Sequence, residues 1–194
     1  FTGKIYPVNP KGGVIEGLQA YPSVRDIPGD VDLAIIVVKN VFVLPTIDQC
    51  YEKGIKGLCI ISAGFKEAGE EGAELEKQLL EKVRAYGMRC VGPNCLGVVN
   101  TDPAVKMDGC FAESLPQRGD IGFVSQSGAL GGGILNILKD LNIGFSQFIS
   151  IGNQADVNAE TAIEYWENVD DVRQILLYME SIQNPANFRR LASR

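Results

Sequence analysis

The stretch Val31-Asp32-Leu33-Ala34-Ile35-Ile36-Val37-Val38 decides the fold class, because its last six residues are all apolar. A continuous apolar run predicts a strand that is covered on both faces, as in a parallel sheet. A helix is expected next, with Asn40 as its cap and Pro45 in its first turn. Its inward-facing residues are spaced three and four apart and are Leu44, Ile47 and Tyr51.

The alternation of strand and helix continues along the chain. Residues 56–62 predict a strand, and a second amphipathic helix through residues 75–83 ends at Gly87. Another strand, 88–91, runs into the loop 92–97. This order predicts a doubly wound parallel sheet with right-handed crossovers.

A second unit of the same kind follows a polar stretch. Between about Asn100 and Gly119 the periodicity stops, which we interpret as a crossing between domains. We therefore predict one domain over residues 1–118 and another over residues 119–194. Beyond the crossing we expect strands at 121–124, 148–151 and 173–179, with helices at 129–141 and about 159–166.

Both predicted domains are expected to be incomplete. Residues 5–10 look like a strand running into a turn with no lead-in. Two or three strands after residue 119 seldom make a whole α/β domain.

The composition excludes several classes of function. The 194 residues contain no histidine, so they hold neither a Ser/His/Asp or Cys/His triad nor an HExxH metal site. A formal net charge of −6 argues against nucleic acid or an anionic membrane as partner. The five cysteines form no CxxC pair, so we expect reduced thiols and no metal. With no apolar run of the roughly 20 residues that a membrane helix needs, we expect a soluble cytoplasmic protein.

The candidate site lies at the carboxyl ends of the predicted strands, where open parallel sheets bind their ligands. These ends are rich in small and polar residues, and each following helix offers free N–H groups to an anion. They are residues 9–13, 39–40, 62–64, 93–94 and 125–128. The pattern favours a phosphorylated ligand.

Two of these ends carry the strongest indications, each with an alternative. Lys11, followed by two glycines, is placed either to meet a phosphate or as a solvated turn lysine. Ser125-Gln126-Ser127-Gly128 fits an anion-binding turn, although Ser127 is also a good helix cap by itself. Glu180 directly follows an apolar strand, where functional groups gather. The glycine fingerprints of dinucleotide and phosphate loops are absent.

Two other features favour a structural interpretation. The acidic residues that open the second helix suit the helix dipole and predict a solvated face; they are Glu67, Glu70, Glu71, Glu74 and Glu76. Cys95 has no basic neighbour in sequence that would lower the pKa of its thiol, so we expect a packed small residue there.

The ordered strand ends together resemble a known family, the NDP-forming acyl-CoA synthetases, including the α chains of ADP-forming acetyl-CoA synthetase and, more distantly, of succinyl-CoA synthetase. The resemblance covers essentially the whole chain. It rests on Tyr6-Pro7-Val8-Asn9-Pro10-Lys11, the strand ending at Val37-Val38, Ser62-Ala63-Gly64-Phe65, Gly92-Pro93-Asn94-Cys95-Leu96-Gly97 and Val124-Ser125-Gln126-Ser127-Gly128-Ala129-Leu130.

The resemblance implies a Rossmann-like CoA-binding domain followed by a flavodoxin-like ligase domain. By this likeness, Asn9, Pro10 and Lys11 would contact the nucleotide or phosphates of coenzyme A, and Asn94 would lie near its thiol. The cofactor would be bordered by Val37, Val38, Ser62, Ala63 and Gly64.

The likeness also implies a phosphate site and a phosphoryl-transfer reaction. Ser125 to Gly128 would cradle a phosphate, and Glu180 matches a glutamate that bonds a phosphorylated histidine. That histidine would fall beyond Arg194. ADP or ATP and Mg²⁺ would bind a separate β subunit or a fused ATP-grasp domain, and an oligomer is expected. In this form the chain alone should not complete the reaction.

Two other functions stay open from the sequence. Related chains without the histidine serve as regulatory CoA-binding modules of fused acetyltransferases. A nicotinamide-dependent dehydrogenase uses a similar first domain, but no acidic residue follows a glycine-rich turn at the spacing that a ribose needs.

Overall fold

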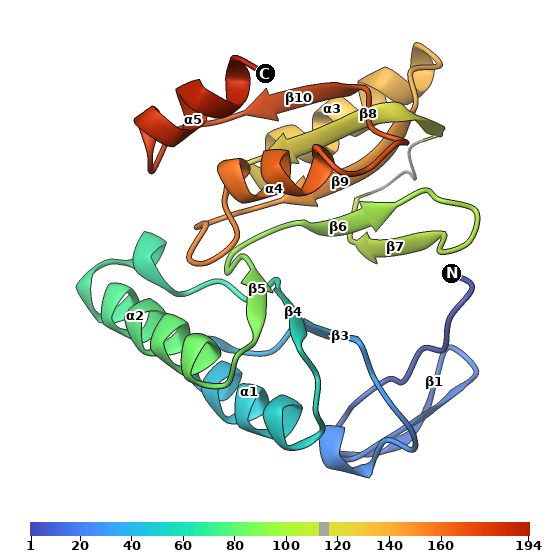
Figure 1. Ribbon diagram of the computed structural model, residues 1–194. Helices are drawn as coiled ribbons and strands as arrows, with labels where there is room; N and C mark the ends of the chain where they lie inside the picture. The colour runs from blue at the N-terminus through green and yellow to red at the C-terminus, as the bar shows by residue number, and fades with distance from the viewer. Residues whose placement is uncertain (113–116) are drawn as a thin grey trace.

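A computed structural model describes residues 1–112 and 117–194 and contains two α/β halves, drawn one above the other in Figure 1. The blue-to-green half holds β1–β5 and the green-to-red half holds β6–β10. The predicted fold class, α/β with parallel strands, is confirmed. No helix in the described ranges is long and apolar enough to cross a membrane.

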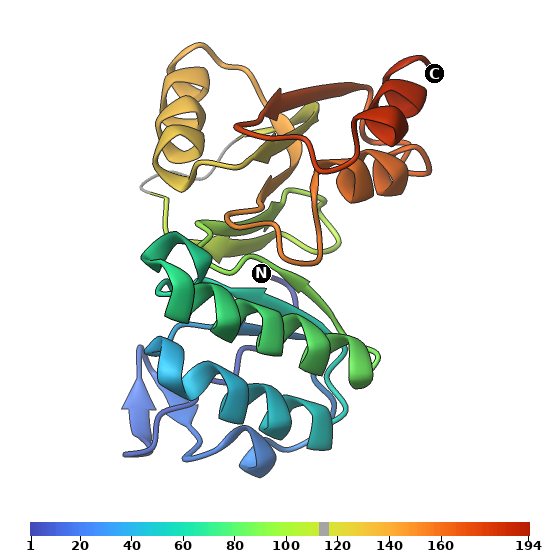
Figure 2. The same ribbon diagram turned by 90° about the vertical axis from the view of Figure 1, so that its left-hand side faces the viewer.

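The first half is built on a three-stranded parallel sheet in the order β3-β4-β5. Helices α1 and α2 lie together on one face of it (Figure 2). Their apolar sides and the strands enclose a core that includes Ile47, Leu58, Phe65 and Leu79. Because both helices lie on the same face, β3 is not covered on both faces as predicted, and its Ile35 is 42% exposed. The bounds are β3 Leu33–Ile36, α1 Val43–Glu52, β4 Gly57–Ile60, α2 Glu70–Ala85 and β5 Arg89–Val91, with short 3₁₀ helices at Val24–Asp26, Asn40–Phe42 and Lys66–Ala68.

The start of the chain differs from the prediction. Residues 5–10 form no strand, and only Val8 makes an isolated bridge, to Tyr21. The strands are instead β1 (Gly13–Ile15) and β2 (Leu18–Ala20), which pair antiparallel. Their turn needs left-handed backbone at Glu16 and Gly17 (φ 48° and 78°), which glycine adopts freely.

The second half is a five-stranded sheet in the order β10-β8-β9-β6-β7. Strands β8, β9 and β10 are parallel, whereas β6 and β7 run antiparallel to their neighbours. Figure 2 shows α3 on one side of this sheet and α4 and α5 on the other. The bounds are β6 Gly97–Asn100, β7 Met107–Cys110, β8 Arg118–Ser125, α3 Gly128–Asp140, β9 Phe145–Ser150, α4 Ala159–Trp166, β10 Gln174–Tyr178 and α5 Pro185–Ala192.

The prediction of an irregular crossing from about Asn100 to Gly119 is wrong in part. β7 lies inside this stretch and pairs with β6, and β6 pairs with β9. β7 was missed because Met107-Asp108-Gly109-Cys110 shows no apolar alternation. The second sheet therefore includes residues before 118, while the domain boundary at 118/119 stays a prediction.

Gly131 sets how closely α3 approaches the end of β8. A Cβ at this position would lie 3.0 Å from both Cβ and Oγ of Ser125 and 3.1 Å from the Phe148 ring. A larger residue would push the start of α3 away from the strand. The sequence thus keeps the turn 125–128 tight against the sheet.

Candidate coenzyme A and phosphate site

The ends of β3, β4 and β5 are joined into one edge by hydrogen bonds through Ser62. The Ser62 hydroxyl donates to Val38 O (2.6 Å) and accepts from Val38 N (3.1 Å). Ser62 O in turn accepts from Asn94 N (3.0 Å). Val38, Ser62 and Asn94 therefore meet at one edge, as the sequence predicts. Residues 37–38, 62–64 and 94 are the ones predicted to border coenzyme A, and we refer to them as the CoA edge.

Asn40 contacts this edge, in a different role from the predicted one. A 3₁₀ turn, Asn40–Phe42, precedes α1, so Asn40 does not cap that helix. Its side-chain amide instead donates to Gly64 O (2.9 Å). Gly64 has φ 96°, and a Cβ there would lie 2.7 Å from the Asn40 amide nitrogen, so a side chain at residue 64 would disrupt this contact.

Apolar side chains stand beside these polar groups. Val37 is 67% exposed and Val38 is 39% exposed, directly beyond the end of β3. Exposed valines next to a hydroxyl and backbone amides suit an aromatic base flanked by polar groups.

The segment Asn9–Lys11 forms a turn of its own. Asn9 Oδ1 accepts from Lys11 N (3.0 Å), and Asn9 O accepts from Gly12 N (2.7 Å). Lys11 is exposed and makes no ion pair with any described residue. No hydrogen bond within the described ranges joins Asn9, Pro10 or Lys11 to the CoA edge. The ammonium group is nevertheless available to an anion.

The turn after β8 leads directly into α3 and leaves backbone donors unused. Ser127 caps the helix, with its Oγ accepting from Leu130 N (3.3 Å). The amides of Ser127, Gly128 and Ala129 have no acceptor among the described residues. Three free N–H groups at the positive end of a helix dipole favour an anion.

The other two residues of this turn are engaged within the protein. Ser125 is buried, and its hydroxyl donates to Ser127 O (2.7 Å). Gln126 N donates to Tyr178 O (2.9 Å), while Gln126 Oε1 accepts from Glu180 N (2.9 Å) and Ser181 N (3.1 Å). Gln126 therefore brings the exposed Glu180 beside the turn.

The CoA edge and this turn come close together through Leu96, which lies two residues after Asn94. A Cβ on Gly128 would be 3.4 Å from Leu96 Cβ. Leu96 N is itself fixed by a hydrogen bond to Ser150 Oγ at the end of β9 (2.9 Å). A ligand whose end reached Asn94 would thus arrive near an anion held at the start of α3.

Comparisons with known proteins identify two families along the chain. The family described as "CoA binding domain" matches residues 2–101, and "Succinyl-CoA ligase like flavodoxin domain" matches residues 118–194. The α subunit of acetate–CoA ligase [ADP-forming] II from Pyrococcus furiosus is 46% identical over 99% of this chain. The chain belongs to the family of NDP-forming acyl-CoA synthetases.

Two further relatives show the range of this family. The 4-hydroxybutyrate–CoA ligase [ADP-forming] of Nitrosopumilus maritimus is 39% identical over 98% of the chain. The structure of acetyl-coenzyme A synthetase 1 from Ca. Korarchaeum cryptofilum, in complex with phosphate and ADP, superposes with a TM-score of 0.93 at 38% identity over 100% of the chain. The chain spans 41% of the P. furiosus subunit, 27% of the N. maritimus ligase and 41% of the Korarchaeum chain.

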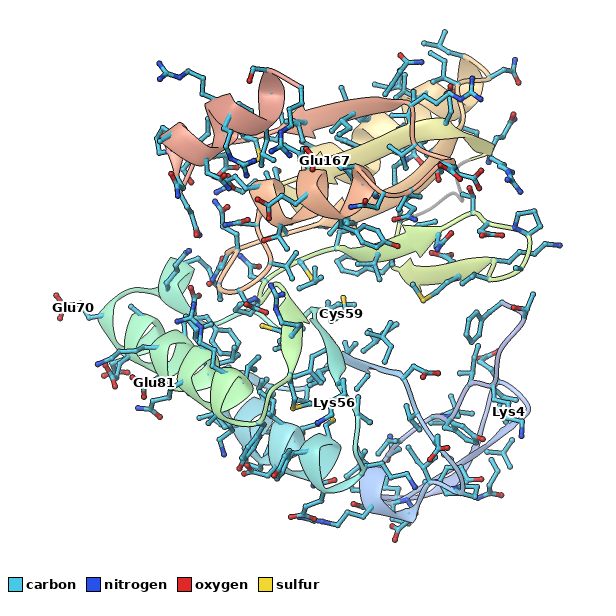
Figure 3. All side chains as sticks on the ribbon, viewed as in Figure 1. Lys4, Lys56, Cys59, Glu70, Glu81 and Glu167 are labelled. Carbon is cyan, nitrogen blue, oxygen red and sulfur yellow. The ribbon has the colours of Figure 1, made fainter. Side chains whose placement is uncertain are left out.

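The chain also contains a buried polar bridge that the sequence analysis missed. Glu76 is buried (8% exposed), so its assignment to a solvated face is wrong. It accepts a hydrogen bond from Asn153, as does the more exposed Glu67. Glu70 points outward from α2, as expected (Figure 3). The sequence shows no sign of this bridge, because Asn153 is far from Glu67 and Glu76 in the chain and belongs to no recognisable motif.

Four cysteines are buried and none of the five forms a disulfide. Cys95 packs against Cys59, with their sulfurs 3.8 Å apart, and its thiol donates to Ile60 O (3.3 Å). The contact with Cys95 and then burial raise the pKa of Cys59. Cys95 is thus a packed residue behind the CoA edge, as predicted. In the described ranges, no group of three or more Cys, Asp or Glu side chains is arranged to hold a metal ion.

Proposed function

We propose that this chain is the CoA-binding and phosphate-cradling part of an ADP-forming acyl-CoA synthetase. The observation that carries the proposal is the close approach of Leu96, two residues after Asn94, to Gly128 at the start of α3, because the proposed thiol and anion sites would then lie side by side. In the reaction, phosphate attacks the thioester of acyl-CoA and releases CoA as a thiol. The acyl phosphate then gives its phosphoryl group to a histidine outside these residues and from there to a nucleoside diphosphate, leaving the free acid.

The CoA edge and the N-terminal turn fit coenzyme A. Lys11 and the turn of Asn9 and Pro10 would hold phosphates of the cofactor, since a free ammonium forms charge-assisted hydrogen bonds with phosphate oxygens. Val37 and Val38 would pack against its base. Ser62, Ala63 and Gly64 would line the path toward the thiol, which would end near Asn94.

The turn 125–128 would hold the phosphate through the free amides of Ser127 and Gly128. Ser125 and Gln126 would support this turn from behind, because their polar groups already bond to the protein. Glu180, placed by Gln126, would hydrogen-bond the incoming histidine and fix its tautomer.

The remaining components belong to the rest of the enzyme. We propose that ADP or ATP and Mg²⁺ bind a β subunit or fused ATP-grasp domain, that the enzyme is an oligomer and that it works in the cytoplasm. The regulatory role in a fused acetyltransferase is not favoured, since the relatives named above are ligases.

Isothermal titration of CoA into the full-length protein tests the proposal. Lys11→Ala removes the predicted phosphate contact and should weaken CoA binding about tenfold, the size of one charge-assisted hydrogen bond. Lys56→Ala is the matched control, because Lys56 is exposed at the amino end of β4, opposite the CoA edge (Figure 3). Absence of CoA binding by the unmodified protein, or equal losses in both variants, would contradict the proposal.

A further inference from the structure

Asn153 is buried (6% exposed) in the loop between β9 and α4, and its polar groups reach across to the first half of the molecule. Its backbone N–H donates to Pro93 O (2.9 Å). Its side-chain nitrogen donates to Glu67 Oε2 (2.6 Å) and to Glu76 Oε2 (2.7 Å). One amide thus bridges two carboxylates from different helices.

The acceptor groups of Asn153 are occupied as well. Its Oδ1 accepts from the side chain of Asn94 (3.3 Å), and its backbone carbonyl accepts from the ammonium group of Lys66. Asparagine suits this position, because a neutral amide can donate to two carboxylates and still accept from another amide. An aspartate of the same shape would place a third carboxylate here and lose both donors.

Through Glu67, Asn153 acts on the CoA edge. Glu67 Oε1 accepts from Gly64 N (2.6 Å) and from Phe65 N (3.2 Å), while its other oxygen is held by Asn153. Burial raises the pKa of Glu67, but the hydrogen bonds from Asn153 and these backbone amides outweigh it, so the pKa is lowered. Glu67 is therefore held as a carboxylate that orients the loop at Gly64.

On its other side the same loop is attached to residues 125–128, which we call the phosphate turn. Ile151 N donates to Ser125 O (2.9 Å). The side-chain nitrogen of Gln154 donates to Ser181 Oγ (3.0 Å), next to Glu180. Residues 151–154 are all buried. This segment therefore spaces the CoA edge from the turn 125–128.

We propose that Asn153 is a positioning residue that fixes the CoA edge, through Glu67 and Asn94, relative to the phosphate turn. This inference rests on the proposed function, since it concerns where the thiol of bound CoA meets the phosphate. Asn153 itself touches neither ligand. It positions the two loops whose groups would contact CoA and phosphate.

The test is Asn153→Asp in the full-length protein, with CoA binding measured by calorimetry at pH 8 and pH 6. At pH 8 the new carboxylate faces those of Glu67 and Glu76, with the Lys66 ammonium nearby and the Arg89–Asp156 pair at the far end of the loop. We expect CoA binding about tenfold weaker than in the wild type. At pH 6 the carboxyl group introduced at residue 153, which faces two like charges, takes up a proton more readily than at pH 8, so the ratio of variant to wild-type affinity should recover.

Asn168→Asp is the control, because it adds the same charge at an exposed site in the second half. It should leave CoA binding unchanged at both pH values. Equal CoA affinity in folded Asn153→Asp and wild type would overturn the positioning role, as would a loss that is the same at pH 8 and pH 6. Wild-type protein that binds no CoA would instead refute the proposed function.

A second variant keeps the test decisive where Asn153→Asp does not fold. Glu67→Gln has one side-chain oxygen, which serves either Asn153 or the amides of Gly64 and Phe65. We expect a smaller loss of CoA affinity, about threefold. Unchanged affinity in Glu67→Gln would overturn the proposal.

Discussion

Replacing Gly152 by alanine tests how tightly the two halves are joined. Gly152 has φ 52°, and a Cβ there would lie 2.3 Å from Asn94 O and 2.4 Å from Pro93 O. Left-handed backbone costs a non-glycine residue about 1 kcal/mol. The overlap forces the loop away and breaks the bond from Asn153 N to Pro93 O, worth about 1 kcal/mol.

The shift also misaligns the Asn153 amide with the carboxylates of Glu67 and Glu76. Hydrogen bonds to charged groups contribute about 1.5–3 kcal/mol each, so a partial loss adds about 1–2 kcal/mol. Gly152→Ala should therefore lower the free energy of unfolding by about 3–4 kcal/mol, a large part of a typical domain's stability.

Urea unfolding followed by Trp166 fluorescence and circular dichroism measures this loss. Gly133→Ala is the control, because a Cβ there meets nothing within 4 Å on the exposed side of α3. It should raise stability by about 0.5–1 kcal/mol. A Gly152→Ala protein within about 1 kcal/mol of the wild type would refute the claim that this loop is wedged against residues 93 and 94.

Three further predictions concern the anion site, the thiols and acid stability. Gly128→Val should weaken phosphate binding at the start of α3 while the fold persists, because a branched side chain covers the free amides; unchanged phosphate or sulfate occupancy in a crystal of the variant would contradict this. Burial raises the pKa of Cys50 and of Cys110 to about 11, so a thiol reagent at pH 8 should label the partly exposed Cys110 slowly and Cys50 only after unfolding; fast labelling of native Cys50 would contradict its burial. Hydrogen bonding to Lys82 is the main cause of the lowered pKa of Asp48, so Asp48 stabilises the fold at neutral pH, and this contribution is lost as pH falls below about 4. Asp48→Asn should be less stable at pH 7, with the difference shrinking under acid; a constant difference in urea midpoint would argue against it.

The edge of the first sheet could be predicted because its signals are local. The apolar runs 33–38 and 57–61 end abruptly at small or polar residues, and such runs are typical of parallel strands, although only one face of β3 is covered here. Parallel strands bring their carboxyl ends to one edge whatever the details of packing. The meeting of Val38, Ser62 and Asn94 follows from topology alone.

The parts that were missed depend on distant partners. β7 is a short strand held by pairing with β6 and carries no pattern of its own. Glu76 resembles the other surface glutamates of its helix in sequence, and its burial depends on a hydrogen bond from Asn153 in the other half of the chain. The hydrogen bond from Glu180 N to Gln126 Oε1 could not be predicted either, because the two residues are 54 positions apart in sequence.

A crystal structure of the full-length protein with CoA and phosphate tests the central claim most directly. The account predicts that the CoA thiol lies beside Asn94 and that phosphate accepts hydrogen bonds from the amides of Ser127, Gly128 and Ala129, with Leu96 between the two sites. CoA bound away from the ends of β3, β4 and β5, or phosphate bound away from the start of α3, would contradict it.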